Sequence, residues 1–330
     1  MPINVAVIGK RNQAARHIEF IKKQRDARLA AVYCPGKAEA AGLPLTDDFD
    51  DVLRADAVIV ASPTPTHAHY LSRLKAYRGY ILLEKPAVSF KEEEKIFLDW
   101  SDDLKSRTRV NFNLLFSKLT ASMTEAIASG RLGRLAAFDV HASHGLAFKP
   151  GYPDSWRSRA ETSLGVMENV GVHYTHLALA LFGGIAQSRT DMMWLAKRQG
   201  PPDTGVFHLT MDNDLRVRIR LSYAAPYCSR WFLLGTDGFW EYDGKEARLC
   251  APRETLDKKG RFGAPPIVKR VKLDYALAWM ESLQMAQKEF FSVAASRGRF
   301  DREEFKLSLR AMDPVFQAKR DLQVSGGPRS

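Results

Sequence analysis

Cysteine and long apolar stretches are the features that this sequence of 330 residues has little of. Its three cysteines, Cys34, Cys228 and Cys250, are spaced neither like a disulfide framework nor like a metal site. No run of about 18 apolar residues is present, which argues against a membrane-spanning helix. The first ten residues lack the pattern of a signal peptide. We therefore expect a cytoplasmic protein with free thiols and no membrane partner.

Acidic residues are also fewer than basic ones: the sequence has 49 Lys and Arg residues but only 38 Asp and Glu residues, which gives a net charge of +11. The basic residues are dispersed, and no helix-turn-helix, zinc-finger or RRM signature occurs, so we expect no nucleic-acid partner. Long-range attraction then favours a small anionic substrate or a dinucleotide. A basic surface without function is an equally good interpretation.

The first part of the chain alternates apolar, strand-like runs with helical stretches, which is typical of a parallel sheet covered on both faces. Ligands of such sheets bind beyond the carboxyl ends of the strands, where Gly9, Ser62 and Lys85 fall. Strands are expected at residues 3–8, 29–33, 56–61, 80–83 and 109–112, and helices at residues 13–24, 66–77 and 89–104.

After Ser117 the pattern changes to strands separated by tight turns, which predicts an antiparallel sheet backed by helices. A length of 330 residues is itself typical of about two domains. Strands are expected at residues 135–142, 188–195, 205–211, 215–222, 230–235 and 239–242, and helices at residues 118–129, 170–182, 275–296 and 302–320.

Gly9 stands where the first strand meets the first helix, the position of a phosphate-binding turn. The usual glycine pattern is altered, because Arg11 replaces the second glycine. Its side chain either enters the space of a pyrophosphate or turns outward to pair with a phosphate. After the second strand, Cys34 replaces the usual carboxylate, while Lys37 favours a ribose 2′-phosphate. An ordinary strand–turn–helix junction is the alternative interpretation.

Lys85 follows a buried strand and lies between Glu84 and Pro86. A lysine that is desolvated there has a lowered pKa and exchanges protons near neutrality. Most lysines are simply solvated, but the position at the carboxyl end of a strand favours a functional role.

Asn169, His173 and His176 form the second polar group. On an α-helix Asn169 and His173 lie four residues apart on one face, which His176 roughly shares. Two histidines without a third ligand predict no metal site. Proton transfer between His173 and a substrate hydroxyl is favoured over a purely structural histidine.

Arg216, Arg218 and Arg220 alternate with apolar residues and so lie on one face of a strand. An anion site, a subunit contact and a solvated face are all compatible with this pattern, and a solvated face is the preferred interpretation.

Together these residues resemble the Gfo/Idh/MocA family, the oxidoreductases typified by glucose–fructose oxidoreductase and inositol dehydrogenase. The most specific motifs are Glu84-Lys85-Pro86, Ser62-Pro63-Thr64-Pro65-Thr66-His67 and Gly171-Val172-His173. The dipeptides Phe112-Asn113 and Trp156-Arg157 support the resemblance. It extends over nearly the whole chain.

The resemblance implies an α/β protein with an N-terminal Rossmann domain, residues 1–117, and a C-terminal α+β domain, residues 118–330. The second domain is expected to carry an open, mostly antiparallel sheet, which in this family often forms the interface of a homodimer or homotetramer. NAD or NADP is the implied cofactor. Hydride exchange with a hydroxyl or keto carbon of a sugar, a nucleotide sugar or a related polyol is the implied reaction.

The resemblance also implies roles for single residues. Lys85 matches the family's catalytic lysine and His173 its catalytic histidine. Asn169 stands where many members carry an assisting aspartate, and its amide weakens any proton relay. Substrate contacts are expected at Asn113, Trp156, Arg157 and His176. Cofactor contacts are expected at Gly9, Arg11, Asn12, Gln13, Cys34, Lys37, Ser62, Pro63, His67, Glu84 and Lys85.

Two further functions stay open because Arg11 and Cys34 depart from the cofactor motif. One is a family member without hydride transfer that binds a ligand for regulation or assembly. The other is redox-neutral cleavage of glycosidic bonds with tightly held NAD, known in some family branches.

Overall fold

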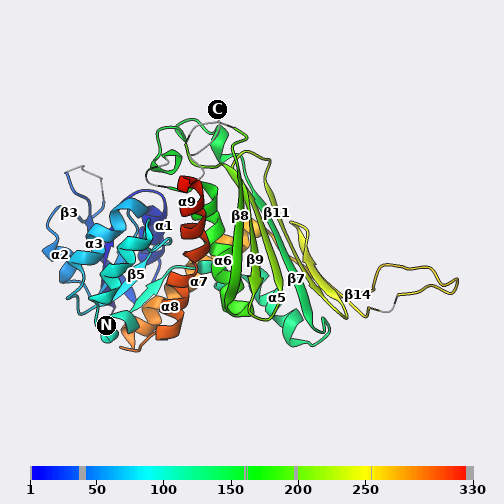
Figure 1. The fold of residues 1–330 in the computed structure, drawn as a ribbon. Coiled ribbons are helices and arrows are strands. Elements are labelled where there is room, and N and C mark those ends of the chain that lie inside the picture. Colours follow the sequence, from blue (N-terminus) through cyan, green and yellow to red (C-terminus); the bar gives the residue numbers. More distant parts are fainter. Residues whose placement is uncertain are drawn as a thin grey trace. The chain divides into compact units, whose positions relative to one another are not determined.

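The computed structural model describes residues 2–36, 42–159, 161, 163–196, 200–253 and 255–324. They form two compact units (Figure 1). The first unit comprises Met1–Phe112 and Leu283–Arg310, and the second comprises Asn113–Ser282 and Ala311–Ser330. The sequence pattern divides the chain near this junction, after Ser117, but it assigns Leu283–Arg310 to the second domain. In the structure this segment returns to the first unit.

The first unit is built on a six-stranded parallel sheet in the order β3-β2-β1-β4-β5-β6. This confirms the predicted Rossmann-type sheet, and the reversal of strand order between β1 and β4 creates the crevice in which such sheets bind ligands. The strands are β1 (Ile3–Ile8), β2 (Ala27–Tyr33), β3 (Leu45–Thr46), β4 (Ala57–Val60), β5 (Tyr80–Leu83) and β6 (Thr108–Val110).

The three helices predicted in the N-terminal segment are shorter in the structure, and a further short helix, α2 (Asp50–Leu53), was not predicted. The predicted three are α1 (Gln13–Lys22), α3 (His67–Arg73) and α4 (Asp102–Ser106). The continuous helix expected at residues 89–104 is wrong, because a 3₁₀ helix, Lys91–Leu98, precedes α4 there. The Ser101 hydroxyl accepts a hydrogen bond from the Leu104 amide at 3.1 Å and so caps a new helix. Phe97 and Trp100 meanwhile pack against Phe305.

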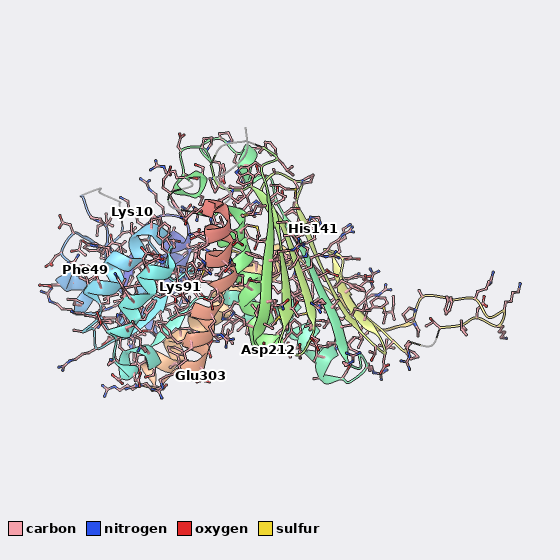
Figure 2. All side chains as sticks on the ribbon, in the orientation of Figure 1. Lys10, Phe49, Lys91, His141, Asp212 and Glu303 are labelled. Carbon is pink, nitrogen blue, oxygen red and sulfur yellow. The ribbon has the colours of Figure 1, made fainter. Side chains whose placement is uncertain are left out.

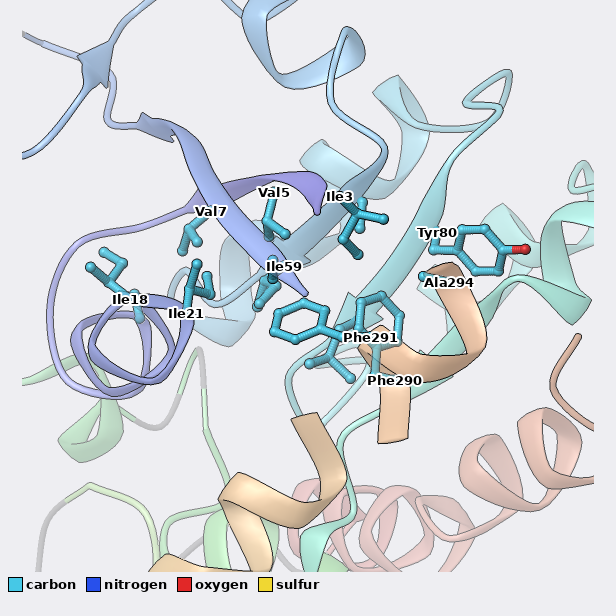
Figure 3. Close-up of a cluster of buried hydrophobic side chains, with 14 of the residues drawn as sticks. Ile3, Val5, Val7, Ile18, Ile21, Ile59, Tyr80, Phe290, Phe291 and Ala294 are labelled. Atoms are coloured by element: carbon cyan, nitrogen blue, oxygen red, sulfur yellow. The ribbon is translucent and has the colours of Figure 1, made fainter. Parts of the chain in front are cut away.

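The returning segment carries the end of α7 (Tyr275–Ala295) and all of α8 (Arg302–Arg310). Phe290, Phe291 and Ala294 are buried in one apolar cluster with residues of β1 and α1 (Figure 3). Burial of these aromatic side chains explains why the segment belongs to the first unit. A nearly buried arginine adds to this attachment, since Arg109 of β6 forms ion pairs with Glu289 and Glu304.

The second unit is built on an eight-stranded sheet in the order β14-β13-β12-β11-β7-β10-β9-β8. All neighbours are antiparallel except β7 and β10, which confirms the prediction of a mostly antiparallel sheet. The strands are β7 (Leu135–Ser143), β8 (Ile185–Met193), β9 (Thr204–Met211), β10 (Arg216–Ser222), β11 (Cys228–Gly235), β12 (Phe239–Tyr242), β13 (Glu246–Cys250) and β14 (Ile267–Lys272). Like β3 of the first unit, β13 and β14 were not predicted from the sequence pattern.

Helices of the second unit cover one face of this sheet (Figure 1). Phe138 of β7 contacts Phe182 on that face, whereas His141 points to the opposite, open face (Figure 2). The single helix expected at residues 302–320 is two helices in the structure. The first, α8, ends at Arg310, and the buried residues Ala311 and Met312 separate it from α9. The helices are α5 (Lys118–Ala128), α6 (Val172–Phe182), the start of α7, and α9 (Asp313–Val324). Within the described residues, no helix combines the length and apolar character needed to cross a bilayer.

Candidate active site

Four neighbouring strands of the first unit end side by side and place polar residues at one edge of the sheet. Gly9 follows β1, Ser62 lies just beyond β4, and Glu84 follows β5. Backbone hydrogen bonds hold this edge together, since the Glu84 amide donates to the Val60 carbonyl and the Asn111 amide donates to the Leu83 carbonyl. The predicted cofactor residues of these loops therefore share one edge of the sheet.

The Gly9 turn has the geometry that the sequence analysis expects of a close approach. Gly9 adopts φ +111°, and a Cβ built there would lie 2.9 Å from the Ala61 carbonyl oxygen. Arg11 is exposed, so its side chain is directed towards solvent. Asn12 precedes α1 at φ 54°, and the first turn of α1, which begins at Gln13, contains no acidic residue. A turn without a Cβ at the positive end of a helix fits a pyrophosphate.

The position after β2 contains no carboxylate among its described residues. Cys34 is half-buried, and its amide donates to the Thr46 carbonyl. Lys37, for which the sequence predicts contact with a 2′-phosphate, lies outside the described residues. The first unit thus fits a dinucleotide at its phosphate turn, and its ribose contacts stay predictions.

His67 joins two loops of this edge. Its ring is fully buried, with Nδ1 3.0 Å from the Pro86 carbonyl oxygen and Nε2 3.0 Å from the Ser62 carbonyl oxygen. Burial lowers the pKa of His67 from its usual value, despite the hydrogen bonds from its ring to these carbonyls. Pro63 directly precedes the 3₁₀ turn, Thr64–Thr66, that leads into α3. His67 holds the two loops together through backbone contacts, so any effect on a cofactor passes through those loops.

Glu84 is also buried, and protein groups hold its carboxylate. Oε1 lies 2.8 Å from His17 Nε2 and accepts a hydrogen bond from Asn111 Nδ2 at 2.7 Å. Burial alone would raise the pKa of Glu84, but these hydrogen bonds and the positive charge of Lys85 outweigh it and lower that pKa. The Lys85 side chain itself is only partly buried. An ionised carboxylate therefore directly precedes the predicted catalytic lysine.

The second unit places His173 on α6, where 4% of the residue is exposed. Its ring meets the Trp279 ring edge-on, with centroids 4.9 Å apart. His176 is buried on the same helix. The helix expected from Val170 begins at Val172. No group of three potential metal-ligating side chains occurs in the part of the chain that the structure describes.

A π-helical turn, Met167–Gly171, precedes α6 and contains Asn169. Asn169 and His173 therefore lie on either side of the junction between the π turn and α6, and not on one continuous α-helix. The amide nitrogen of Asn169 donates to Ser163 Oγ at 3.2 Å and to the Gly165 carbonyl at 2.9 Å. These bonds use Asn169 to hold the turn that leads to His173.

The predicted substrate residues outside α6 also belong to the second unit. Asn113 is buried, and its amide donates to Ser282 Oγ at 2.7 Å. Trp156 and Arg157 lie on a 3₁₀ turn, with the guanidinium 4.5 Å from the centre of the indole ring. The structure gives each of these residues protein contacts, and their substrate contacts stay predictions.

Four residues of these clusters were not predicted from the sequence: His17, Asn111, Trp279 and Gln287, whose Nε2 lies 3.3 Å from His17 Nδ1. His17 carries a weak signal, since it is a lone histidine on the apolar face of α1. Trp279 and Gln287 carry none, because their partners are more than a hundred residues away in the sequence.

Two family models together match most of the chain. Residues 3–112 match "Oxidoreductase family, NAD-binding Rossmann fold", and residues 120–241 match "GFO/IDH/MocA C-terminal domain". The chain belongs to the Gfo/Idh/MocA family. Its resemblance to that family, inferred from the sequence motifs, is thereby confirmed.

Curated relatives of this Gfo/Idh/MocA chain include inositol dehydrogenases. Inositol 2-dehydrogenase of Rhizobium meliloti (strain 1021) is 26% identical over 191 residues, 56% of either chain. A scyllo-inositol 2-dehydrogenase (NADP(+)) of Bacillus subtilis (strain 168) is 25% identical over 208 residues, 61% of this chain and 56% of the relative. The match thus spans just over half the length of these relatives.

Solved structures of the same fold extend over nearly the whole chain. Levoglucosan dehydrogenase in complex with NADH and levoglucosan superposes with a TM-score of 0.80 at 16% identity, covering 97% of this chain and 98% of the other. A myo-inositol dehydrogenase of Corynebacterium glutamicum ATCC 13032 gives 0.75 at 18% identity, covering 99% and 98%. At such identities the likeness establishes the fold.

Proposed function

We propose that this protein is an NAD- or NADP-dependent oxidoreductase that exchanges hydride with a hydroxyl or keto carbon of a sugar, a nucleotide sugar or a related polyol. The Gly9 turn carries the proposal, because only glycine fits beside the Ala61 carbonyl and the turn leads into the positive end of α1. Membership of an oxidoreductase family whose relatives include inositol dehydrogenases supports the substrate class. The net charge of +11 favours an anionic substrate.

The protein supplies binding and proton handling in this proposal. When bound, the nicotinamide supplies the carbon that accepts or donates hydride. Backbone amides of the turn that follows Gly9 would hold the phosphates, and the loops at Ser62 and Lys85 border the same edge of the sheet. Lys85 hydrogen-bonds the reacting substrate oxygen, and His173 removes or supplies its proton.

Calorimetric titration with NAD⁺, NADH, NADP⁺ and NADPH tests the cofactor step. Micromolar binding of one of them is expected, and a preparation that neither binds nor carries any of them would contradict the proposal. Tightly held cofactor in the purified protein, without net oxidation of any polyol, would favour redox-neutral chemistry instead. Cofactor binding without any turnover would favour a ligand-binding family member.

Turnover of Lys85→Ala and of His173→Ala then tests the proton step. Each variant is expected to lose about 10²-fold or more in kcat while its circular dichroism spectrum stays that of the parent. The exposed His69, on α3 of the first unit, provides His69→Ala as a control that should retain turnover. Near-normal turnover of both site variants would overturn the assignment.

A further inference from the structure

A chain of four buried polar side chains in the first unit includes Glu84, the residue that precedes Lys85 in the sequence. Asn111 and His17 meet the carboxylate of Glu84, and Gln287 of α7 reaches His17 from the opposite side, with its Nε2 3.3 Å from His17 Nδ1. All four are at most 5% exposed. They come from α1, the end of β5, the segment after β6, and the returning helix.

Gln287 Nε2 lies 3.3 Å from His17 Nδ1 and also donates to the His17 carbonyl oxygen at 3.3 Å. An amide nitrogen cannot accept a hydrogen bond, so Gln287 Nε2 donates to Nδ1. The ring hydrogen is then on Nε2, from which it is donated to the Glu84 carboxylate at 2.8 Å. Asn111 donates to the same oxygen. Glu84 is therefore oriented by two donors, one of which is itself oriented by Gln287.

Fold stability is a poor explanation for this cluster. His17 stands on the apolar face of α1, beside Ala14, Ile18 and Ile21. Buried charged and polar pairs seldom stabilise a fold more than well-packed apolar side chains of the same volume. The buried amide oxygens of Gln287 and Asn111 moreover have no hydrogen-bond partner among the described residues. An apolar cluster would have filled this site at lower cost in desolvation.

We propose that Glu84 is the positioning residue of Lys85: its buried carboxylate, oriented by His17, Asn111 and Gln287, sets the charge state of the neighbouring ammonium group. The inference rests on the proposed function in one respect, namely that Lys85 contacts the reacting oxygen. It also gives the returning helix a part in the site, because Gln287 lies 270 residues from His17 in the sequence.

Labelling of Lys85 by a limiting amount of acetic anhydride tests the charge coupling without cofactor or substrate. Mass spectrometry of the Lys85 peptide across pH 6–11 gives the pH of half-maximal labelling. A carboxylate next to a partly buried ammonium is worth about one pKa unit, so Glu84→Gln should lower this pH by about one unit. Glu93→Gln is the matched control, because its carboxylate caps the amides of Ser89 and Phe90 in the same segment.

The labelling result overturns the inference if folded Glu84→Gln stays within about 0.2 units of the parent, or if Glu93→Gln shifts equally. Should Glu84→Gln fail to fold, Glu84→Asp withdraws the same charge by one methylene and should shift labelling in the same direction by less. Because this measurement uses the protein alone, it remains informative even if no cofactor binds and the proposed function fails.

A second arm tests the orientation of Glu84 in the working enzyme. His17→Leu removes the donor to Glu84 and should lower kcat about tenfold, with KM for the cofactor within about twofold. His17→Gln keeps an N–H donor and should recover most of that loss. Equal kcat values for the two variants, at equal thermal stability, would contradict a positioning role for His17.

Discussion

Gly9 has a positive φ and lies so close to the backbone of Ala61 that a side chain would not fit there. Gly9→Ala should destabilise the protein by about 1–3 kcal/mol and weaken dinucleotide binding, because the new methyl would lie 2.9 Å from the Ala61 carbonyl oxygen. Urea unfolding and calorimetry measure the two effects. Gly36→Ala is the control, since Gly36 has φ +76° and no atom within 4 Å of an added Cβ. Equal losses in both variants would show that backbone strain alone matters.

His67 makes stability depend on pH. Burial lowers its pKa in the folded state below the 6.5 of an unfolded chain, so the unfolded state binds the proton more tightly. Its contribution is complete above pH 6.5 and is lost as pH falls towards the lowered pKa. Between pH 7.5 and 5.5, the parent should lose more stability than His67→Asn. Urea midpoints at both pH values measure this.

His69 provides the comparison for His67, because it is exposed on the same helix. His69→Asn should keep the pH dependence of the parent. The prediction is contradicted if His67→Asn loses as much stability on acidification as the parent does.

At this scale the sequence could place Gly9, Glu84 and Lys85, because strand ends and motifs are local. It could not find His17, since a lone histidine in an apolar helix face has no local partner. Only its contacts with Glu84 and Gln287 distinguish it from an ordinary core residue.

At the scale of elements, α7 is the helix that the sequence assigns to the second domain but that contributes to both units. Phe290→Ala should cost about 3–5 kcal/mol, because Phe290 is fully buried among the residues of β1 and α1. Met285 is 52% exposed on the same helix, so Met285→Ala should cost less than about 0.5 kcal/mol. Similar unfolding midpoints for the two variants would contradict the packing of the returning segment.

Apolar periodicity predicted most strands closely, and β5 and β12 have the predicted bounds. It failed where tertiary contacts interrupt a helix. Residues 89–104 have a helical composition, yet the side chains of Phe97 and Trp100 pack against Phe305 of α8 and the chain breaks at Ser101. The π turn before α6 is equally invisible to a pattern that counts in steps of 3.6 residues.

At the scale of the whole molecule, several of the basic side chains form ion pairs with acidic residues. Arg109 bridges two acidic residues of the returning segment, and Arg248 pairs with three carboxylates on the second sheet. On the open face of that sheet, Arg216, Arg218 and Arg220 are exposed on β10, as their alternation predicts. The predicted homodimer or homotetramer and the cytoplasmic location stay predictions.

The sequence by itself determined the family, the two types of sheet and the residues at the strand ends. These depend on local periodicity, glycine geometry and short motifs, which are properties of neighbouring residues. Only the tertiary structure decided that Leu283–Arg310 belongs to the first unit and that Gln287, His17 and Asn111 surround Glu84. Those contacts join segments that are far apart in the chain. They form because the apolar and polar side chains of these segments are buried together, and a local sequence pattern does not encode such long-range burial.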